Sequence, residues 1–230
     1  MPSSSRSPWA GAPRSHDPRV RRPLPRGRAG RRDRDRQLDQ HFLCDAGRIA
    51  AMLDALGVIR ADPRAPLARA PLEVIELGAG IGSVSARVSS AVPLRLVELD
   101  PRLCRVLRAR FSRRPRTRVT CGDAFAVLDR ALSSRARASH ADRPAGQPEL
   151  RILANLPFHL TDRLLDALAC APRGSYGRAV VAVAASDRTD DRDGRLVVEP
   201  VCDLPGACFR PRQPFDSRAV LVRPRRPPER

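Results

Sequence analysis

Short apolar runs recur along the chain, and most of them end at a glycine, an acid or an amide. They are rich in β-branched residues and separated by polar segments, so they predict β-strands. Ligands bind at the carboxyl ends of the strands in an open α/β sheet, which makes the polar residues after each run candidates for a site. The runs cover residues 72–77, 94–99, 118–121, a stretch ending at Ala154, 180–183 and 219–222.

Apolar residues at helical spacing lie between several of these strands. A further helix is expected over residues 83–90, with its N-terminus facing a ligand. Strands that alternate with helices predict an α/β fold, here a mainly parallel sheet with helices on both faces. The apolar sets are Ile49, Met52, Leu53 and Leu56; Leu103, Val106, Leu107 and Phe111, which follow Pro101; and Leu164, Leu165 and Leu168.

The first three strand patterns each deliver residues suited to a nucleoside cofactor. Residues 78–82 read GAGIG, and glycines allow both a positive φ and a close approach of the backbone to a ligand. Glu98 ends the second strand, where an acid holds ribose hydroxyls in doubly wound sheets. Asp123 follows the third strand and is a candidate acceptor for an adenine amine. The alternatives are a solvated acid at Glu98 and an ordinary N-cap at Asp123.

The fourth strand leads into Asn155-Leu156-Pro157-Phe158. Asn155 offers an amide oxygen, Pro157 fixes the backbone so that a carbonyl can point into the site, and Phe158 offers a flat face for a base. This tetrad suits methyl transfer to the exocyclic amine of a base. The alternative is a strand followed by a proline turn and a core phenylalanine.

Charge and cysteine usage narrow the class of partner. The net charge is +18, and all 43 basic residues are arginine, which favours binding to phosphate polyanions. The chain has no C-x-x-C pair, no Cys/His metal spacing, no signal peptide and no long apolar stretch. We therefore expect a cytoplasmic, monomeric protein that binds neither a metal ion nor a membrane.

The ordered motifs resemble the rRNA adenine N6-methyltransferases, the family of the KsgA-type dimethyltransferases and the erythromycin-resistance (Erm) methylases. The matching segments are QHFL (residues 40–43), ELGAGIG (76–82), VELDP (97–101), Gly122-Asp123, NLPF (155–158) and the stretch from Phe209 to Ser217. The resemblance implies a Rossmann-like class I fold with S-adenosyl-L-methionine as methyl donor. It also implies cofactor contacts at His41, Leu43, Gly78, Glu98, Asp123 and Asn155.

The resemblance implies N6 methylation of an adenine in rRNA by Asn155, Leu156, Pro157 and Phe158. The arginine-rich lead into QHFL is similar to that of Erm proteins, so we expect large-subunit rRNA as the target and antibiotic resistance of the macrolide type as the outcome. One alternative is the KsgA-type branch, which acts on small-subunit rRNA. The other is a non-catalytic nucleic-acid-binding relative.

Composition predicts the organisation of the chain. Residues 1–36 are rich in Arg, Pro, Ser and Gly, and they are expected to form a disordered arm that follows RNA phosphates. Residues 37–224 are the predicted catalytic domain, with a mobile loop at 133–149 and a basic tail at 225–230. The helical C-terminal domain of the family is expected to be absent.

Overall fold

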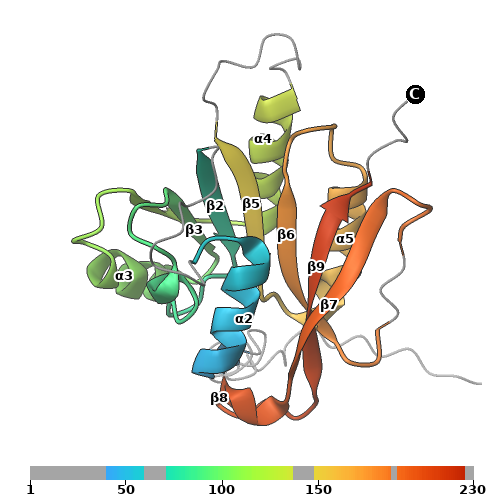
Figure 1. Cartoon of the computed structure of the whole chain (residues 1–230). Helices are drawn as coiled ribbons and strands as arrows, with labels where there is room; N and C mark the ends of the chain where they lie inside the picture. Colours follow the sequence, from blue (N-terminus) through green and yellow to red (C-terminus); the bar gives the residue numbers. More distant parts are fainter. Residues whose placement is uncertain (1–39, 60–70, 137–147, 188–190, 226–230) are drawn as a thin grey trace, which may run out of the picture. The chain divides into compact units, whose positions relative to one another are not determined.

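Seven strands form one sheet in the order β4-β3-β2-β5-β6-β9-β7 (Figure 1). The computed structural model describes residues 40–59, 71–136, 148–187 and 191–225, which all belong to the unit Asp39–Arg230. The first five strands run parallel, and β9 is antiparallel to β6 and β7. The strands are β2 (Leu72–Leu77), β3 (Leu94–Glu98), β4 (Thr117–Cys121), β5 (Glu149–Ala154), β6 (Arg178–Ala184), β7 (Leu196–Leu204) and β9 (Ser217–Pro224).

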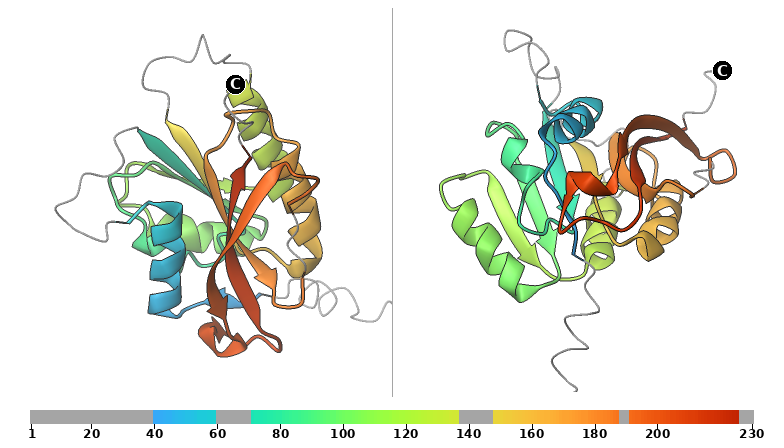
Figure 2. Two further views of the ribbon diagram at one scale, coloured as in Figure 1. Left: turned by 45° about the vertical axis from the view of Figure 1, so that its right-hand side comes forward. Right: turned by 90° about the horizontal axis from the view of Figure 1, so that it is seen from below.

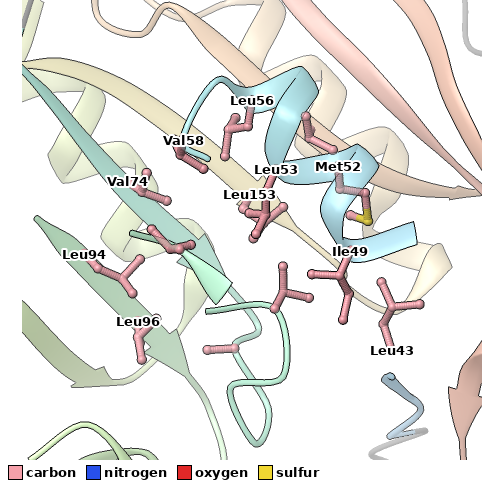
Figure 3. Packing of buried hydrophobic residues seen from close by; sticks show 14 of the residues in the cluster. Leu43, Ile49, Met52, Leu53, Leu56, Val58, Val74, Leu94, Leu96 and Leu153 are labelled. Carbon is pink, nitrogen blue, oxygen red and sulfur yellow. The ribbon is translucent and has the colours of Figure 1, made fainter. Parts of the chain in front are cut away.

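Helices cover both faces of this sheet, as expected (Figure 2). Alternation along β2 sends Val74 to one face and Ile75 and Leu77 to the other, so two apolar clusters form. The first cluster joins α2 and α3 to the sheet, and Figure 3 shows residues of α2 directed at β2 and β3. The second cluster joins α4 and α5 to the opposite face. The helices are α2 (Ala46–Leu56), α3 (Pro101–Arg110), α4 (Ala124–Ala136) and α5 (Thr161–Ala169).

Both ends of α2 are satisfied by specific partners. Asp45 Oδ1 accepts a hydrogen bond from the Arg48 N–H at 2.9 Å, and Gly57 ends the helix in the left-handed region with φ of 71°. The buried guanidinium of Arg151, on β5, donates to the carbonyls of Leu56 at 2.5 Å and Gly57 at 2.8 Å. A cation thus meets the negative end of the helix and fixes α2 to the sheet.

The prediction of a helix over residues 83–90 is wrong. Only a 3₁₀ turn forms there, η1 (Ser85–Arg87), and Val88 is extended. The guanidinium of Arg114 donates to the carbonyls of Ser85 at 3.1 Å and Val88 at 2.8 Å. These bonds satisfy carbonyls in this segment without an α-helix, and a partner so distant in the sequence is invisible to local periodicity.

The boundaries of the expected loop at 133–149 are also wrong. Residues 133–136 complete α4, and Glu149 begins β5; residues 137–147 lie outside the described residues. The expected arm (1–36) and all but the first residue of the expected tail (225–230) lie outside them as well. Strand β7 was not predicted, because Pro200 and a register shift between Pro200 and Cys202 interrupt its alternation.

Candidate active site

The glycine turn lies where the strand order of the sheet reverses. β2 has β3 on one side and β5 on the other, so residues 78–82 stand at the switch point at which open α/β sheets bind ligands. Gly78 and Gly80 have φ of 70° and 56°. A Cβ on Gly78 would lie 2.7 Å from Leu156 Cδ2, and one on Gly80 would lie 2.8 Å from the Phe42 ring. Side chains from QHFL and NLPF thus enclose the turn, and only glycine fits.

Glu98 organises this turn through its carboxylate. Oε2 accepts the N–H of Gly80 at 2.7 Å, and Oε1 accepts the N–H groups of Leu99 at 2.8 Å and Asp100 at 2.9 Å. Three donors leave about one of the four lone-pair positions of a carboxylate, on Oε2. The buried Glu98 is therefore more than a solvated acid, and it retains one acceptor position for a hydroxyl such as that of a ribose.

Glu76 is a second buried acid beneath the turn, and sequence reasoning gave it no role. Burial raises the pKa of this carboxyl to about 8; the hydrogen bond from the Ser85 hydroxyl lowers the pKa, and the charge of Glu98 raises it further. A carboxyl with that pKa carries a proton at neutral pH in most molecules. Only the apolar neighbours of Glu76 in LEVIEL could have indicated its burial.

The NLPF segment leaves β5 directly beside the glycine turn. The carbonyl oxygen of Asn155 would lie 3.5 Å from a Cβ on Gly78. Neither the Asn155 side chain nor the Leu156 carbonyl makes a hydrogen bond to a described residue, so both remain available as acceptors. Pro157 is extended, with φ of −52° and ψ of 135°, and Phe158 begins a 3₁₀ turn, η2 (Phe158–Leu160), with its ring partly exposed.

Phe215 is an aromatic neighbour that sequence reasoning missed. Its ring centroid lies 5.3 Å from that of Phe158, with an angle of 57° between the planes, and the residue is 47% exposed. The Phe215 carbonyl accepts from Gln213 Nε2 at 2.9 Å, and Asp216 Oδ1 accepts the Gly206 N–H at 2.9 Å. The signal was an aromatic residue directly before Asp216-Ser217 in the proline-bearing segment that follows Phe209.

QHFL is held against that same C-terminal segment. β1 (Phe42–Leu43) pairs antiparallel with β8 (Phe209–Arg210), and His41 Nδ1 lies 3.0 Å from the Pro211 carbonyl oxygen. The Leu43 side chain is buried in the first apolar cluster. A cofactor contact from Leu43 therefore has to come from its main chain.

Asp123 occupies the carboxyl end of β4. Its Oδ1 accepts the Ala126 N–H at 2.8 Å in the first turn of α4, which matches the alternative of a helix cap. The residue is exposed, and no hydrogen bond to a described residue engages its second carboxylate oxygen. The Gly122 N–H donates to the Glu98 carbonyl at 2.9 Å and links the ends of β3 and β4.

The predicted residues therefore come together on four adjacent strand ends. Their order along the edge is Asp123 after β4, Glu98 on β3, Gly78 after β2 and Asn155 after β5. The turn contains glycines at its centre and is hydrogen-bonded to the Glu98 carboxylate. The amide of Asn155 and the carbonyl of Leu156 precede the Phe158 ring in the sequence. This donor and acceptor set fits a nucleoside cofactor on one side and an amine on the other.

A mainly parallel sheet with this switch point is a Rossmann-like α/β fold. The model of the family "Ribosomal RNA adenine dimethylase" matches residues 32–189. The chain belongs to this family. It is thus an rRNA adenine methyltransferase with S-adenosylmethionine as its cofactor.

Relatives that are named as rRNA methyltransferases match most of the chain. The "Ribosomal RNA small subunit methyltransferase A" of Burkholderia ambifaria (strain MC40-6) is 28% identical over 84% of this chain and 70% of its own length. The protein of that name from Synechococcus sp. (strain JA-3-3Ab) is 28% identical over 90% and 70%.

Two solved structures share the fold. The 23S rRNA methyltransferase ErmE has a TM-score of 0.57 at 22% identity over 80% of this chain and 70% of its own. A dimethyladenosine transferase from Plasmodium falciparum has a TM-score of 0.57 at 17% identity over 80% and 64%.

Two structural observations concern metal ions and membranes. In the described part of the chain, no three His, Cys, Asp or Glu side chains are grouped so that they could hold a metal ion. None of the helices among residues 40–59, 71–136, 148–187 and 191–225 is long and apolar enough to cross a membrane.

Proposed function

We propose that the chain transfers methyl groups from S-adenosylmethionine to N6 of an adenine in large-subunit rRNA. The observation that carries the chemistry is that Asn155 Oδ1 and the Leu156 carbonyl are unengaged acceptors in the segment that leaves β5 next to Gly78 and leads to Phe158. The arginine-rich lead into QHFL supports the large-subunit target. Resistance of the macrolide type is the proposed outcome.

The bound cofactor supplies an electrophilic methyl group on a sulfonium. An adenine N6 amine is a poor nucleophile, because its lone pair is delocalised into the ring. Hydrogen bonds from its two N–H groups to Asn155 Oδ1 and the Leu156 carbonyl favour a more pyramidal nitrogen. That geometry directs the nitrogen lone pair at the methyl group that the cofactor would supply, and the amine would lose an N–H proton to solvent after the transfer.

The remaining contribution of the chain is orientation. A base inside a duplex has to leave the stack to reach this edge, which costs roughly a few kcal/mol. Stacking on Phe158 returns about 1–3 kcal/mol of that cost. Holding amine, methyl carbon and sulfur in line removes a further entropic part of the barrier. For the cofactor, we propose contacts from His41, the Leu43 main chain, Gly78, Glu98 and Asp123, with Asn155 between the two ligands.

Small-subunit rRNA is the second candidate target. It is favoured by the relatives at 28% identity, whose names state the small subunit. The experiment is expression in a susceptible bacterium, with methylated adenines mapped by primer extension on both rRNAs and macrolide tolerance measured in the same cells. A stop on large-subunit rRNA with raised tolerance supports the first proposal, and a stop confined to small-subunit rRNA replaces it with the second. The absence of additional N6-methylated adenine in both rRNAs contradicts both.

A further inference from the structure

One flank of the domain carries unusually concentrated positive charge. Between Pro101 and Gly122 the sequence has eight arginines and no acidic residue. The segment comprises α3, the turn after it and the edge strand β4. We call it the α3–β4 arginine surface; its exposed members are Arg102, Arg105, Arg108, Arg110, Arg113, Arg116 and Arg118, and Arg114 is partly buried.

Few of these charges are neutralised. Arg102 lies 3.6 Å from Asp100. Arg110 and Arg116 donate to the carbonyls of Ile81 at 2.8 Å and Ala91 at 3.1 Å, contacts that hold a guanidinium in place and leave its charge uncompensated. Four members form no ion pair with any described residue: Arg105, Arg108, Arg113 and Arg118.

The opposite flank shows that this is more than a general excess of arginine. Figure 1 places α3 and β7 at opposite sides of the sheet. Around β7 three arginines are paired with acids, and Arg195 is the exception: Arg192 lies 2.6 Å from Asp162 and 3.0 Å from Asp166, Arg223 lies 2.5 Å from Glu199, and Arg225 lies 3.3 Å from Asp191. The same residue type is therefore balanced on one flank and unbalanced on the other.

The arginine surface adjoins the candidate site. α3 begins at Pro101, three residues after Glu98, and β4 ends at Cys121, two residues before Asp123. Along α3, Arg102, Arg105 and Arg108 recur every third residue and so follow one side of the helix at intervals of about 4.5 Å. A polyanion lying along α3 would therefore pass the carboxyl ends of β3 and β4, where Glu98 and Asp123 lie.

We propose that the α3–β4 arginine surface binds the phosphate backbone of the RNA substrate and sets its register, so that the target base reaches Asn155. This inference rests on the proposed function. Exposed guanidinium groups without acid partners suit phosphates, because their planar fork of donors matches phosphate oxygens. Such contacts position the nucleic acid without reading its sequence. Simple protection of the edge strand β4 by charge is the competing explanation.

The test compares two triple variants that remove the same charge. Arg105→Gln/Arg108→Gln/Arg113→Gln alters the surface, and Arg130→Gln/Arg173→Gln/Arg195→Gln removes three exposed arginines elsewhere. RNA affinity is measured from low to moderate salt on a protein-free rRNA transcript that the unmutated chain methylates. Each lost phosphate contact lowers the slope of log affinity against log salt by roughly 0.7–0.9.

We expect the surface variant to lose about 2 from this slope and to show a higher KM for RNA with little change in kcat. The control variant should retain the slope of the unmutated chain. Both should keep their affinity for S-adenosylmethionine by calorimetry and their thermal midpoint, which shows that fold and cofactor site are intact. Equal slopes in the two variants would overturn the proposal and leave charge protection of β4 as the explanation.

Failure of the proposed function would give a different experimental result. If the unmutated chain methylates no rRNA transcript, that function fails, and the two variants are compared on a 20-base-pair RNA hairpin instead. A slope lost only in the surface variant would still support phosphate binding at α3–β4, and equal slopes would still refute it.

Discussion

At the scale of single residues, Asn155 carries the proposed chemistry. Asn155→Ala removes one acceptor from the amine and is expected to slow methyl transfer about 100-fold or more, the typical effect of deleting one preorganised polar contact in a transition state. Its cofactor affinity should fall less. Tritiated-methyl incorporation and calorimetry measure the two effects, with the exposed neighbour variant His159→Ala as control. Full activity in Asn155→Ala would refute the assignment.

The contact between Phe158 and Phe215 makes a second prediction. A tilted aromatic pair contributes about 0.5–1.5 kcal/mol and fixes the plane of the Phe158 ring. Phe215→Ala should therefore reduce kcat/KM for RNA by about threefold to tenfold, and Phe158→Ala should reduce it further, because the stacking face itself is lost. Phe158→Tyr should be tolerated. Equal turnover in all the variants would exclude a role for stacking.

Glu76 predicts how stability depends on pH. Its folded pKa is about 8 and its ordinary value is 4.5, so the folded chain holds a proton that the unfolded chain has released. The contribution of this proton to the free energy of unfolding is fully present below about pH 4.5. It is lost as the pH rises to about 8, by at most about 1.4 kcal/mol per pH unit. Glu76→Gln should flatten this decline in urea unfolding, because Gln can still accept from Ser85 and does not titrate.

The control for Glu76 is Glu73, on the same strand. Glu73 pairs with Arg95 at 3.4 Å and Arg135 at 2.7 Å and is partly exposed. Glu73→Gln should leave the pH dependence between 5 and 8 in place. If Glu76→Gln retains the slope of the unmutated chain, the burial of this carboxyl does not govern it.

At the scale of elements, two guanidinium groups hold the C-terminal end of α2, and that of Arg151 makes more of the contacts. Arg151→Met leaves the carbonyls of Leu56 and Gly57 without their donor, which should lower the free energy of unfolding by about 1–3 kcal/mol. Arg178 donates to a single carbonyl, that of Ala55 at 3.1 Å. Arg178→Met is therefore the matched control and should cost less. Similar thermal midpoints for the two variants would contradict this account.

Elements with strong local patterns could be predicted from the sequence, and those made by distant contacts could not. The strand at residues 72–77 was predicted with the bounds it has, because LEVIEL contains adjacent β-branched residues and runs directly into a glycine. The 3₁₀ turn at Ser85–Arg87 depends on Arg114, and β7 depends on pairing with β9 across a register shift. Neither leaves a periodic signal in its own segment.

At the scale of the whole molecule, the fold and the sheet edge that bears the site could be predicted, because successive strand patterns each end in a glycine or a polar residue. Glu98 and the glycine turn were both placed there, and their direct contact at Gly80 appears only in the structure. Phe215 was missed because an aromatic residue before Asp216-Ser217 does not by itself indicate contact with Phe158, 57 residues earlier. The family membership of the chain confirms the enzyme class and the cofactor.

The pairing of β1 with β8 has a consequence for biosynthesis. Phe42, which closes over Gly80, belongs to a two-residue strand whose only partner among the described strands is Phe209–Arg210. A ribosome makes Phe209 167 residues after Phe42, whereas domains otherwise begin to fold from the N-terminus. The nascent chain thus cannot pair Phe42 with its partner strand until Phe209 and Arg210 have been translated. Closure over the glycine turn is therefore completed only after strands β2 to β7 have been synthesised.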